Sequence, residues 1–455
     1  MNLPDGLLLS FYGDDFTGST DTMEVLAKAG LRTALFLEPP SGEMLSRFDG
    51  LRAVGVAGVS RSLTPREMDR QLPPIFGSLR HLGAPLFHVK VCSTFDSAPE
   101  IGSIGHTIGL GRRVFGSDFV PLVVGAPALH RFCVFGSLFA RSGPESEVFR
   151  LDRHPTMSRH PVTPMEESDL RLHLAQQTSQ GIGLIDVLQL DLPQERMCEE
   201  VDALTSAGQE IVLFDTLTPQ HLTVVGQFLW QRALSHPPLF VVGSSGVEYA
   251  LAGYWQAQNL LPEPPEFPAE AVEQIVVVSG SCSPVTARQI AWAEARGFAV
   301  IALDPIELLE AEAVEARWET PLREALAALD QGRSVVLHTC LGPEDPRLVA
   351  TRAYLAQTGE DGSGRELGQR LGRLLKTLLE RSRVRRAVVA GGDTCGYAAR
   401  EMGITALEMA APMAPGSPLC HVYAEDKIID GMQILFKGGQ VGRIDLFGSI
   451  LKGSV

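Results

Sequence analysis

The feature that most constrains the fold is an alternation, along almost the whole chain, of short apolar runs with amphipathic stretches of helical spacing. The apolar runs have the length of buried strands, and the amphipathic stretches repeat apolar residues at the period of a helix. Strands that alternate with helices pair in parallel, because each helix returns the chain to the sheet edge where the previous strand began. The sequence therefore predicts an α/β fold, with mostly parallel sheets flanked by helices.

A proline-rich acidic segment at residues 261–268 interrupts this alternation. It reads Leu-Pro-Glu-Pro-Pro-Glu-Phe-Pro and can continue neither a helix nor a central strand, because proline lacks the backbone N–H. A chain of 455 residues is also long for a single core. We expect two domains, residues 1–262 and residues 271–455, with an active site in the cleft between them.

The amino-acid composition indicates which kinds of partner and which cell compartment the protein is suited to. The formal net charge is -15 and lysine and arginine are not clustered, which argues against a nucleic-acid partner. The seven cysteines are widely spaced without a C-x-x-C pair, which is typical of reduced thiols. The N-terminus does not resemble a signal peptide, and no apolar run has the length of a membrane span. We predict a cytoplasmic protein that binds neither nucleic acid nor membrane, and a homodimer is left open.

Two adjacent carboxylates, Asp14 and Asp15, lie between an apolar run at residues 7–12 and a helical pattern from Asp21 to Gly30. They fall in a strand-to-helix turn, where open α/β sheets bind their ligands. Either aspartate could be the cap of the helix, because aspartate is a preferred N-cap residue. Two neighbouring carboxylates cannot both cap one helix end. We therefore expect at least one of them to be available for a ligand or for proton abstraction.

A second strand-to-helix loop carries Arg61. It follows the predicted strand 53–59 and precedes the capping box Thr64–Glu67, which marks the start of a helix. A guanidinium in such a loop could bind a carboxylate in bidentate fashion, and an ordinary surface ion pair is the alternative. The same capping pattern at Thr163–Glu166 predicts another helix start.

Lys90 ends the predicted strand 86–91, and the hydroxyl residues Ser93 and Thr94 follow it. Hydroxyls in a loop often serve only local turn bonds. Next to a lysine at a strand end, they predict a polar pocket for a polyol acid.

Turns rich in glycine and hydroxyl residues recur in the second domain. Small residues at helix starts leave backbone N–H groups open to phosphate. The residues concerned are Ser281, Ser283, Gly391, Gly392, Asp393, Thr394, Gly416, Lys437, Gly438 and Gly439. Asp393 could bind magnesium or cap its helix. Any one such turn is ordinary, but several in one domain point to a nucleotide, although neither G-x-x-x-x-G-K-[ST] nor G-x-G-x-x-G is present.

These motifs, in this order, resemble those of the four-carbon acid sugar kinase family. The resemblance rests on Asp14–Gly18, Lys90–Thr94, Gly391–Thr394 and Lys437–Gly442, and it covers nearly the whole chain. It implies an N-terminal domain that binds a sugar acid and a C-terminal domain that binds ATP, with Mg²⁺ as cofactor. By resemblance, Asp14, Asp15, Arg61, Lys90, Ser93 and Thr94 belong to the substrate side, and Ser281, Gly391 to Thr394, Gly416 and Gly438 to the nucleotide side.

The chain departs from the family pattern at Asp96, where many members carry an arginine. An anion there should weaken binding of a plain tetronate and favour a branched oxo-acid such as 3-oxo-isoapionate. We hypothesise that Asp15, or failing it Asp14, accepts the proton of the attacking hydroxyl, while Arg61 and Lys90 hold the carboxylate or oxo group. The alternatives are a cytosolic regulator that binds a sugar acid without catalysis, and a dehydrogenase that lacks the usual dinucleotide fingerprint.

Overall fold

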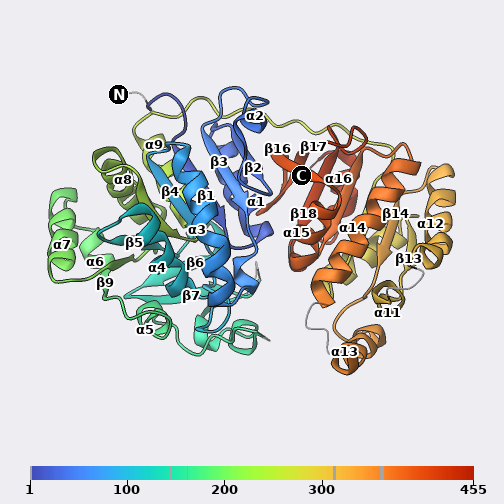
Figure 1. The fold of residues 1–455 in the computed structure, drawn as a ribbon, viewed down its shortest axis with the longest axis horizontal. Helices are drawn as coiled ribbons and strands as arrows, with labels where there is room; N and C mark the ends of the chain where they lie inside the picture. The colour runs from blue at the N-terminus through green and yellow to red at the C-terminus, as the bar shows by residue number, and fades with distance from the viewer. Residues whose placement is uncertain (1–2, 144–145, 161, 311–313, 359–362, 455) are drawn as a thin grey trace. The chain divides into compact units, whose positions relative to one another are not determined.

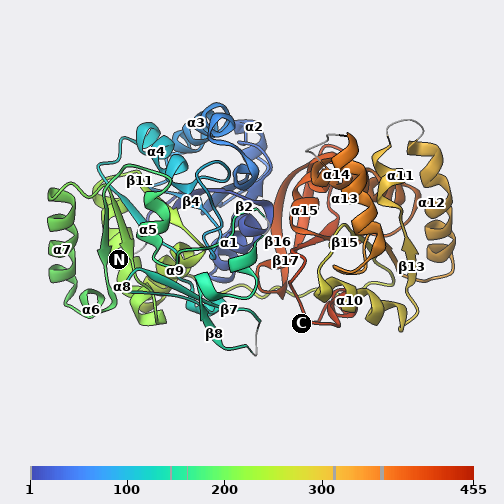
Figure 2. The same ribbon diagram turned by 90° about the horizontal axis from the view of Figure 1, so that it is seen from below.

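The computed structural model describes residues 3–143, 146–160, 162–310, 314–358 and 363–454. The chain divides into two compact units (Figures 1 and 2). The first comprises Met1–Ala34 and Glu38–Pro265, and the second comprises Leu35–Leu37 and Glu266–Val455. Each unit combines a mostly parallel sheet with flanking helices, so the predicted α/β class is confirmed.

The first unit contains a parallel sheet in the order β3-β1-β4-β11-β5-β10-β9. Its strands are β1 (Leu9–Gly13), β3 (Ala53–Ala57), β4 (Leu86–Lys90), β5 (Val120–Val123), β9 (Ile182–Ile185), β10 (Ile211–Phe214) and β11 (Leu239–Gly243). A small antiparallel sheet is formed by β6 (Arg131–Val134), β7 (Ser137–Arg141) and β8 (Val148–Arg150). The central strands are buried along their whole length, which explains why they read as continuous apolar runs.

The helices of the first unit cover both faces of its parallel sheet. They are α1 (Phe16–Lys28), α2 (Gly42–Leu45), α3 (Pro65–His81), α4 (Ile104–Phe115), α5 (Leu170–Ala175), α6 (Val187–Leu190), α7 (Gln194–Ser206), α8 (Pro219–Ser235) and α9 (Gly246–Ala257), with 3₁₀ turns η1 (Ser60–Ser62), η2 (Pro127–Leu129), η3 (Leu151–Arg153) and η4 (Met157–Arg159). Figure 2 shows α3 and α4 on one face and α8 and α9 on the other. On the α4 face, stacked rings pack the helix against the sheet: the ring centroids of Phe115 in α4 and Phe87 in β4 lie 4.4 Å apart.

The second unit contains a sheet in the order β13-β14-β12-β15-β18-β17-β16. Its strands pair in parallel from β13 to β18, and the pairs β18–β17 and β17–β16 are antiparallel. Its strands are β12 (Val276–Ser279), β13 (Ala299–Ala302), β14 (Val335–His338), β15 (Arg386–Ala390), β16 (Ile404–Ala414), β17 (Ser417–Ala424) and β18 (Gln433–Lys437). Leu35–Leu37, which include the end of β2 (Thr33–Phe36), group with this unit, and Leu35 pairs with Leu407.

The helices of the second unit are α10 (Pro284–Glu294), α11 (Pro305–Leu309), α12 (Val314–Asp330), α13 (Pro346–Thr358), α14 (Ser363–Arg381), α15 (Gly392–Glu401) and α16 (Leu446–Lys452). Among the residues that the structure describes, none of the helices combines the length and the apolar character needed to cross a bilayer.

Of the capping boxes predicted at Thr64 and Thr163, the structure has the first and not the second. The box at Thr64 is confirmed, because the Thr64 N–H donates to Glu67 Oε2 at 2.8 Å and α3 begins at the next residue. The predicted helix start at Thr163–Glu166 is wrong, since α5 begins only at Leu170. The Thr163 N–H donates instead to the ring of His160 at 3.0 Å, and its hydroxyl lies 3.1 Å from the same nitrogen. The threonine therefore caps no helix.

Helix α1 begins at Phe16, earlier than the Asp21 that the apolar spacing indicated. Its first turns are built from small and polar residues, so the apolar period is not visible there. The start is set by Asp15, whose side chain accepts the Gly18 N–H.

Candidate functional site

The carboxyl ends of four parallel strands meet at one edge of the first unit. In register, Gly13 of β1 lies opposite Ala57 of β3 and Lys90 of β4, and Lys90 lies opposite Gly243 of β11. The loops after these strands are tied together by their backbones: the Asp14 N–H donates to the Lys90 carbonyl at 2.9 Å, and the Arg61 N–H to the Asp14 carbonyl at 3.0 Å. Strand order therefore brings Asp14, Arg61 and Lys90 to one place.

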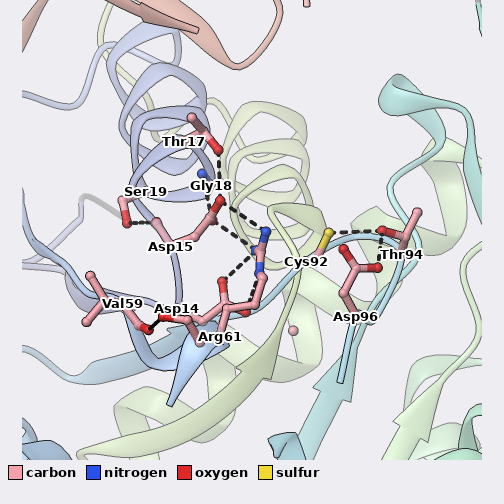
Figure 3. Close-up of polar contacts among 12 residues, drawn as sticks. Asp14, Asp15, Thr17, Gly18, Ser19, Val59, Arg61, Cys92, Thr94 and Asp96 are labelled. Atoms are coloured by element: carbon pink, nitrogen blue, oxygen red, sulfur yellow. Dashed lines mark hydrogen bonds and ion pairs between the residues drawn. The ribbon is translucent and has the colours of Figure 1, made fainter. Parts of the chain in front are cut away.

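The Arg61 guanidinium bridges the two aspartates (Figure 3). Its Nε and Nη2 donate to Asp14 at 3.2 and 2.8 Å, and its Nη1 and Nη2 donate to Asp15 at 3.0 and 2.9 Å. Both carboxylates therefore have a protein partner, and the prediction that at least one is available for a ligand or for proton abstraction stays a prediction. Because Arg61 commits most of its donors to these carboxylates, the geometry gives it the task of holding both in place.

The two aspartates have different environments. Asp15 accepts bonds from the Thr17 hydroxyl at 2.8 Å and the Gly18 N–H at 2.9 Å, and it is the N-cap of α1. Burial opposes its ionisation, but the charges of Arg61 and Lys90 together with the hydrogen bonds from Thr17 and Gly18 outweigh burial, so the pKa of Asp15 is lowered. Burial prevails at Asp14, whose pKa is raised although Arg61 opposes the shift. The side chain of Asp15 is 22% exposed and that of Asp14 is 7% exposed, so Asp15 is the easier one for a ligand to reach.

Lys90 is a buried cation with open donors. It is 3% exposed, and its ammonium makes no hydrogen bond or ion pair with any other residue in the described part of the chain. The ammonium lies against α1, where a Cβ added at Gly18 would stand 2.8 Å from Nζ. It acts electrostatically on Asp15 and on the buried Asp21. A buried ammonium with unfilled donors is suited to bind an oxygen of a small ligand.

The loop after Lys90 holds the predicted hydroxyls. The Thr94 hydroxyl donates to Asp96 at 2.7 Å and lies 3.0 Å from the Cys92 sulfur. Burial raises the pKa of the Cys92 thiol to about 11, so the thiol stays protonated at neutral pH. Ser93 is half-buried in the same loop. The Thr94 hydroxyl therefore donates its proton to Asp96 and not to a ligand. The charge of Asp96 also helps to raise the pKa of Arg61.

A second edge, in the second unit, collects the residues predicted for the nucleotide. Ser279 of β12 lies opposite Ala390 of β15, and Ala390 lies opposite Lys437 of β18. Strand β17 runs antiparallel to β18, so the hairpin turn that precedes it, with Gly416 at φ 74°, lies at the same edge. The turns after β12, β15 and β18 and the β16–β17 turn therefore face one end of the sheet, as in other open α/β sites.

The backbones of these turns approach one another closely. Gly391 has φ 133°, which favours glycine, and a Cβ there would stand 2.6 Å from the Thr394 hydroxyl. A Cβ at Gly439 would stand 2.6 Å from the Ser281 hydroxyl. Gly391 caps α15 through its backbone, and Ser283 caps α10 by accepting the Val285 N–H at 3.2 Å. Two helix N-termini at one sheet edge are suited to bind phosphate groups.

Thr286 is a site residue that the sequence analysis missed. Its hydroxyl donates to the Gly439 carbonyl at 2.8 Å and accepts from Lys437 Nζ at 2.8 Å and from the Ser281 hydroxyl at 3.1 Å. It thereby joins the turns after β12 and β18. Lys437 is fully buried beneath them, and burial lowers its pKa to about 8. In the sequence, the only sign of this role is that Thr286 lies in the first helical turn after the predicted N-cap Ser283.

Two family models match the chain, one in each part. Residues 9–251 match a family model described as a sugar-binding N-terminal domain, and residues 276–447 match a nucleotide-binding C-terminal domain. The chain is 45% identical to a 3-oxo-isoapionate kinase of Paraburkholderia graminis, over 99% of this chain and 95% of that protein. It is 31% identical to a 3-oxo-tetronate kinase of Methylobacterium radiotolerans, over 98% and 99% respectively.

A solved structure from Salmonella typhimurium LT2, which bears a provisional tRNA synthase name, shares the fold with a TM-score of 0.77 and 26% identity, covering 96% of this chain and 97% of that one. The fold and the matched models define a protein with a sugar-binding part followed by a nucleotide-binding part. The chain belongs to the four-carbon acid sugar kinase family.

Proposed function

We propose that the chain is an ATP-dependent kinase that phosphorylates an alcohol group of a small oxo sugar acid. Residues 1–262 would bind the acid, and residues 271–455 would bind the nucleotide. The observation that carries the proposal is the edge of the first unit, where the carboxylate of Asp15 lies beside the open donors of Lys90. The relative that is 45% identical makes 3-oxo-isoapionate the first candidate substrate, and 3-oxo-tetronate is the second.

The proposed chemistry assigns one task to each side chain. Asp15 accepts the proton of the attacking hydroxyl, and Asp14 is the second candidate. The hydroxyl oxygen forms a bond to the terminal phosphorus of ATP as the bond from that phosphorus to ADP breaks. Lys90 donates to an oxygen of the acid, and Arg61 holds both aspartates in position. Because phosphoryl transfer depends mostly on placement and charge, this fixed cluster supplies what the acceptor side requires.

The nucleotide side would be formed by the turns of the second unit. The N-termini of α10 and α15 offer backbone N–H groups to phosphate oxygens. Mg²⁺ commonly binds one or two carboxylates together with phosphate oxygens, and the exposed Asp393 in the first turn of α15 fits that pattern. When bound, the metal would neutralise charge on the phosphate groups.

An ATP-consumption screen over four- and five-carbon aldonic and oxo-aldonic acids tests the proposal, with the phosphorylated position read by phosphorus NMR. We expect the branched oxo-acid to be consumed with the highest kcat/KM. A thermal-shift series with each acid, with and without ATP and magnesium, runs beside it. Stabilisation by an acid with no turnover of ATP would favour the regulator instead, and a change in nicotinamide absorbance would favour the dehydrogenase.

The substitution Gly392→Ala tests the nucleotide turn. A Cβ at Gly392 meets no atom within 4 Å, and a Cβ at Gly77, on the surface of α3, also meets none. Both substitutions place alanine in a helix, so we expect neither to destabilise the fold. If phosphate approaches the Gly392 backbone, Gly392→Ala should raise KM for ATP by about 10-fold, the equivalent of about 1.4 kcal/mol. Gly77→Ala should leave it unchanged. Equal KM values in both variants would place the phosphate elsewhere.

A further inference from the structure

Arg131 is a partly buried cation that forms no ion pair with any residue in the described part of the chain. It begins β6, directly after the 3₁₀ turn η2 that follows β5. Its Nη1 donates to the carbonyls of Leu129 at 3.0 Å and of His130 and Arg141 at 3.3 Å, which fixes the guanidinium in place. Within the described residues, its buried Nε has no hydrogen-bond partner and no carboxylate pairs with it. Such a charge is costly to bury unless an anion joins it.

A second open donor lies beside it. His154 is 5% exposed, and its Nδ1 accepts the N–H groups of Thr156 and Met157, each at 3.2 Å. The ring proton therefore resides on Nε2, which is buried and forms no hydrogen bond of normal geometry among the described residues, although the Arg141 carbonyl lies near it. Burial lowers the pKa of His154, so the ring is a neutral donor at pH 7. It faces the same Arg141 carbonyl that Arg131 contacts.

Arg131 lies near the loop that follows Lys90. Cys92 and Asp96 of that loop act electrostatically on Arg131 and also on Arg61. In the sheet order, β4 lies between β3, whose loop carries Arg61, and β5, which leads to Arg131. The two arginines therefore lie on opposite sides of the loop that follows β4. Arg61 commits most of its donors to Asp14 and Asp15, whereas the Nε of Arg131 remains open.

We propose that Arg131, together with the Nε2–H of His154, binds the carboxylate of the sugar acid and selects acids over neutral sugars. A planar guanidinium matches a carboxylate well, and the anion would offset the cost of burying Arg131. Lys90 is then left for an oxo or hydroxyl oxygen near the reacting end. The identity of the ligand as a sugar acid rests on the proposed function, but the prediction of an oxyanion site does not.

The test compares Arg131→Met with Arg153→Met, which removes an arginine that is 76% exposed in the adjacent 3₁₀ turn. For Arg131→Met we expect KM for the acid to rise by about 10- to 100-fold, with kcat changed less and KM for ATP unchanged. Because a partly buried cation without an ion pair is removed, the melting temperature without ligand should stay the same or rise. His154→Gln, which retains an N–H donor, should raise KM less than Arg131→Met does. Arg153→Met should behave as the parent chain.

Binding is also measured without ATP, by thermal shift with the acid, with the sugar alcohol of equal chain length, and with inorganic phosphate. We expect the acid to stabilise the parent chain and to lose this effect in Arg131→Met. If acids stabilise the parent chain in this way while no ATP is consumed, the kinase proposal fails and the carboxylate site stands. A site that prefers phosphate or the sugar alcohol would overturn the inference. So would a lower melting temperature of Arg131→Met with an unchanged KM, because Arg131 would then be structural.

Discussion

Replacing Asp15 by asparagine is expected to lower kcat by about 10²-fold or more while the chain remains folded. Asparagine is as good an N-cap residue as aspartate, so its side-chain oxygen can still accept the Gly18 N–H that starts α1. The amide cannot accept the proton of the attacking hydroxyl. The loss should therefore lie in kcat, with a smaller change in KM for the acid. The melting temperature should fall modestly, because the charge paired with Arg61 is removed.

Asp14→Asn is the matched control, because both aspartates contact Arg61 but Asp14 is the less exposed. We expect it to reduce kcat less than Asp15→Asn does. A larger loss in Asp14→Asn would reverse the assignment, and a change in KM alone for Asp15→Asn would make Asp15 a binding residue.

The pH profile separates the same two candidates. The lowered pKa of Asp15 keeps it ionised well below neutral pH, so kcat/KM should stay level as the pH falls from 7 to about 5. The raised pKa of Asp14 would make the rate fall at a higher pH if Asp14 were the base. Rates measured at saturating ATP across this range distinguish the two.

Much of the arrangement could be predicted from the sequence because parallel strands share an edge. The expected strands that end near Asp14 and Lys90 exist, and their pairing through β1 and β4 places these loops together. The capping box at Thr64 fixed the start of α3 and so the short turn that carries Arg61. These features depend on local patterns, which a single sequence displays.

The side-chain contacts could not be predicted in the same way. Arg61 bridges both aspartates because of the direction in which its side chain points, and Asp15 lies 46 residues before it in the chain. No local pattern in the sequence shows this contact. The contacts of Thr286 with Gly439 and of Arg131 with Arg141 likewise join separate elements. At Thr163 a local capping pattern was overridden by the nearby ring of His160. Tertiary packing decided each of these cases.

Arg61→Met is expected to destabilise the chain by about 2 kcal/mol at pH 7. Removing one partner of a buried ion pair typically costs about 3 to 5 kcal/mol, and the side chain of Arg61 is 27% exposed, which reduces the effect. Burial and mutual repulsion disfavour the ionised forms of the two adjacent carboxylates, and in the variant the guanidinium no longer offsets these effects. Activity should fall as well, because the two carboxylates lose the group that positions them.

The sign of the pH dependence follows from the pKa shifts. In the parent chain the pKa of Asp15 is lowered by folding, so its stabilisation is present above the unfolded pKa of about 3.9 and is lost as the pH falls through the folded pKa. In Arg61→Met both carboxyl pKa values should be raised. The folded state then takes up protons before the unfolded state does. The loss of stability relative to the parent chain therefore shrinks as the pH falls from 7 towards about 4.

Urea denaturation of the parent chain and of Arg61→Met at pH 7 and pH 5 measures this deficit. Arg150→Met is the control, because Arg150 pairs with Asp152 at 2.6 Å but its side chain is 48% exposed, and such surface pairs contribute about 1 kcal/mol or less. Adding Asp14→Asn to Arg61→Met should restore part of the lost stability at pH 7, since it removes one of the two uncompensated charges. A deficit of equal size at both pH values, unaffected by Asp14→Asn, would mean that Arg61 stabilises the turn by packing and not by holding the aspartates.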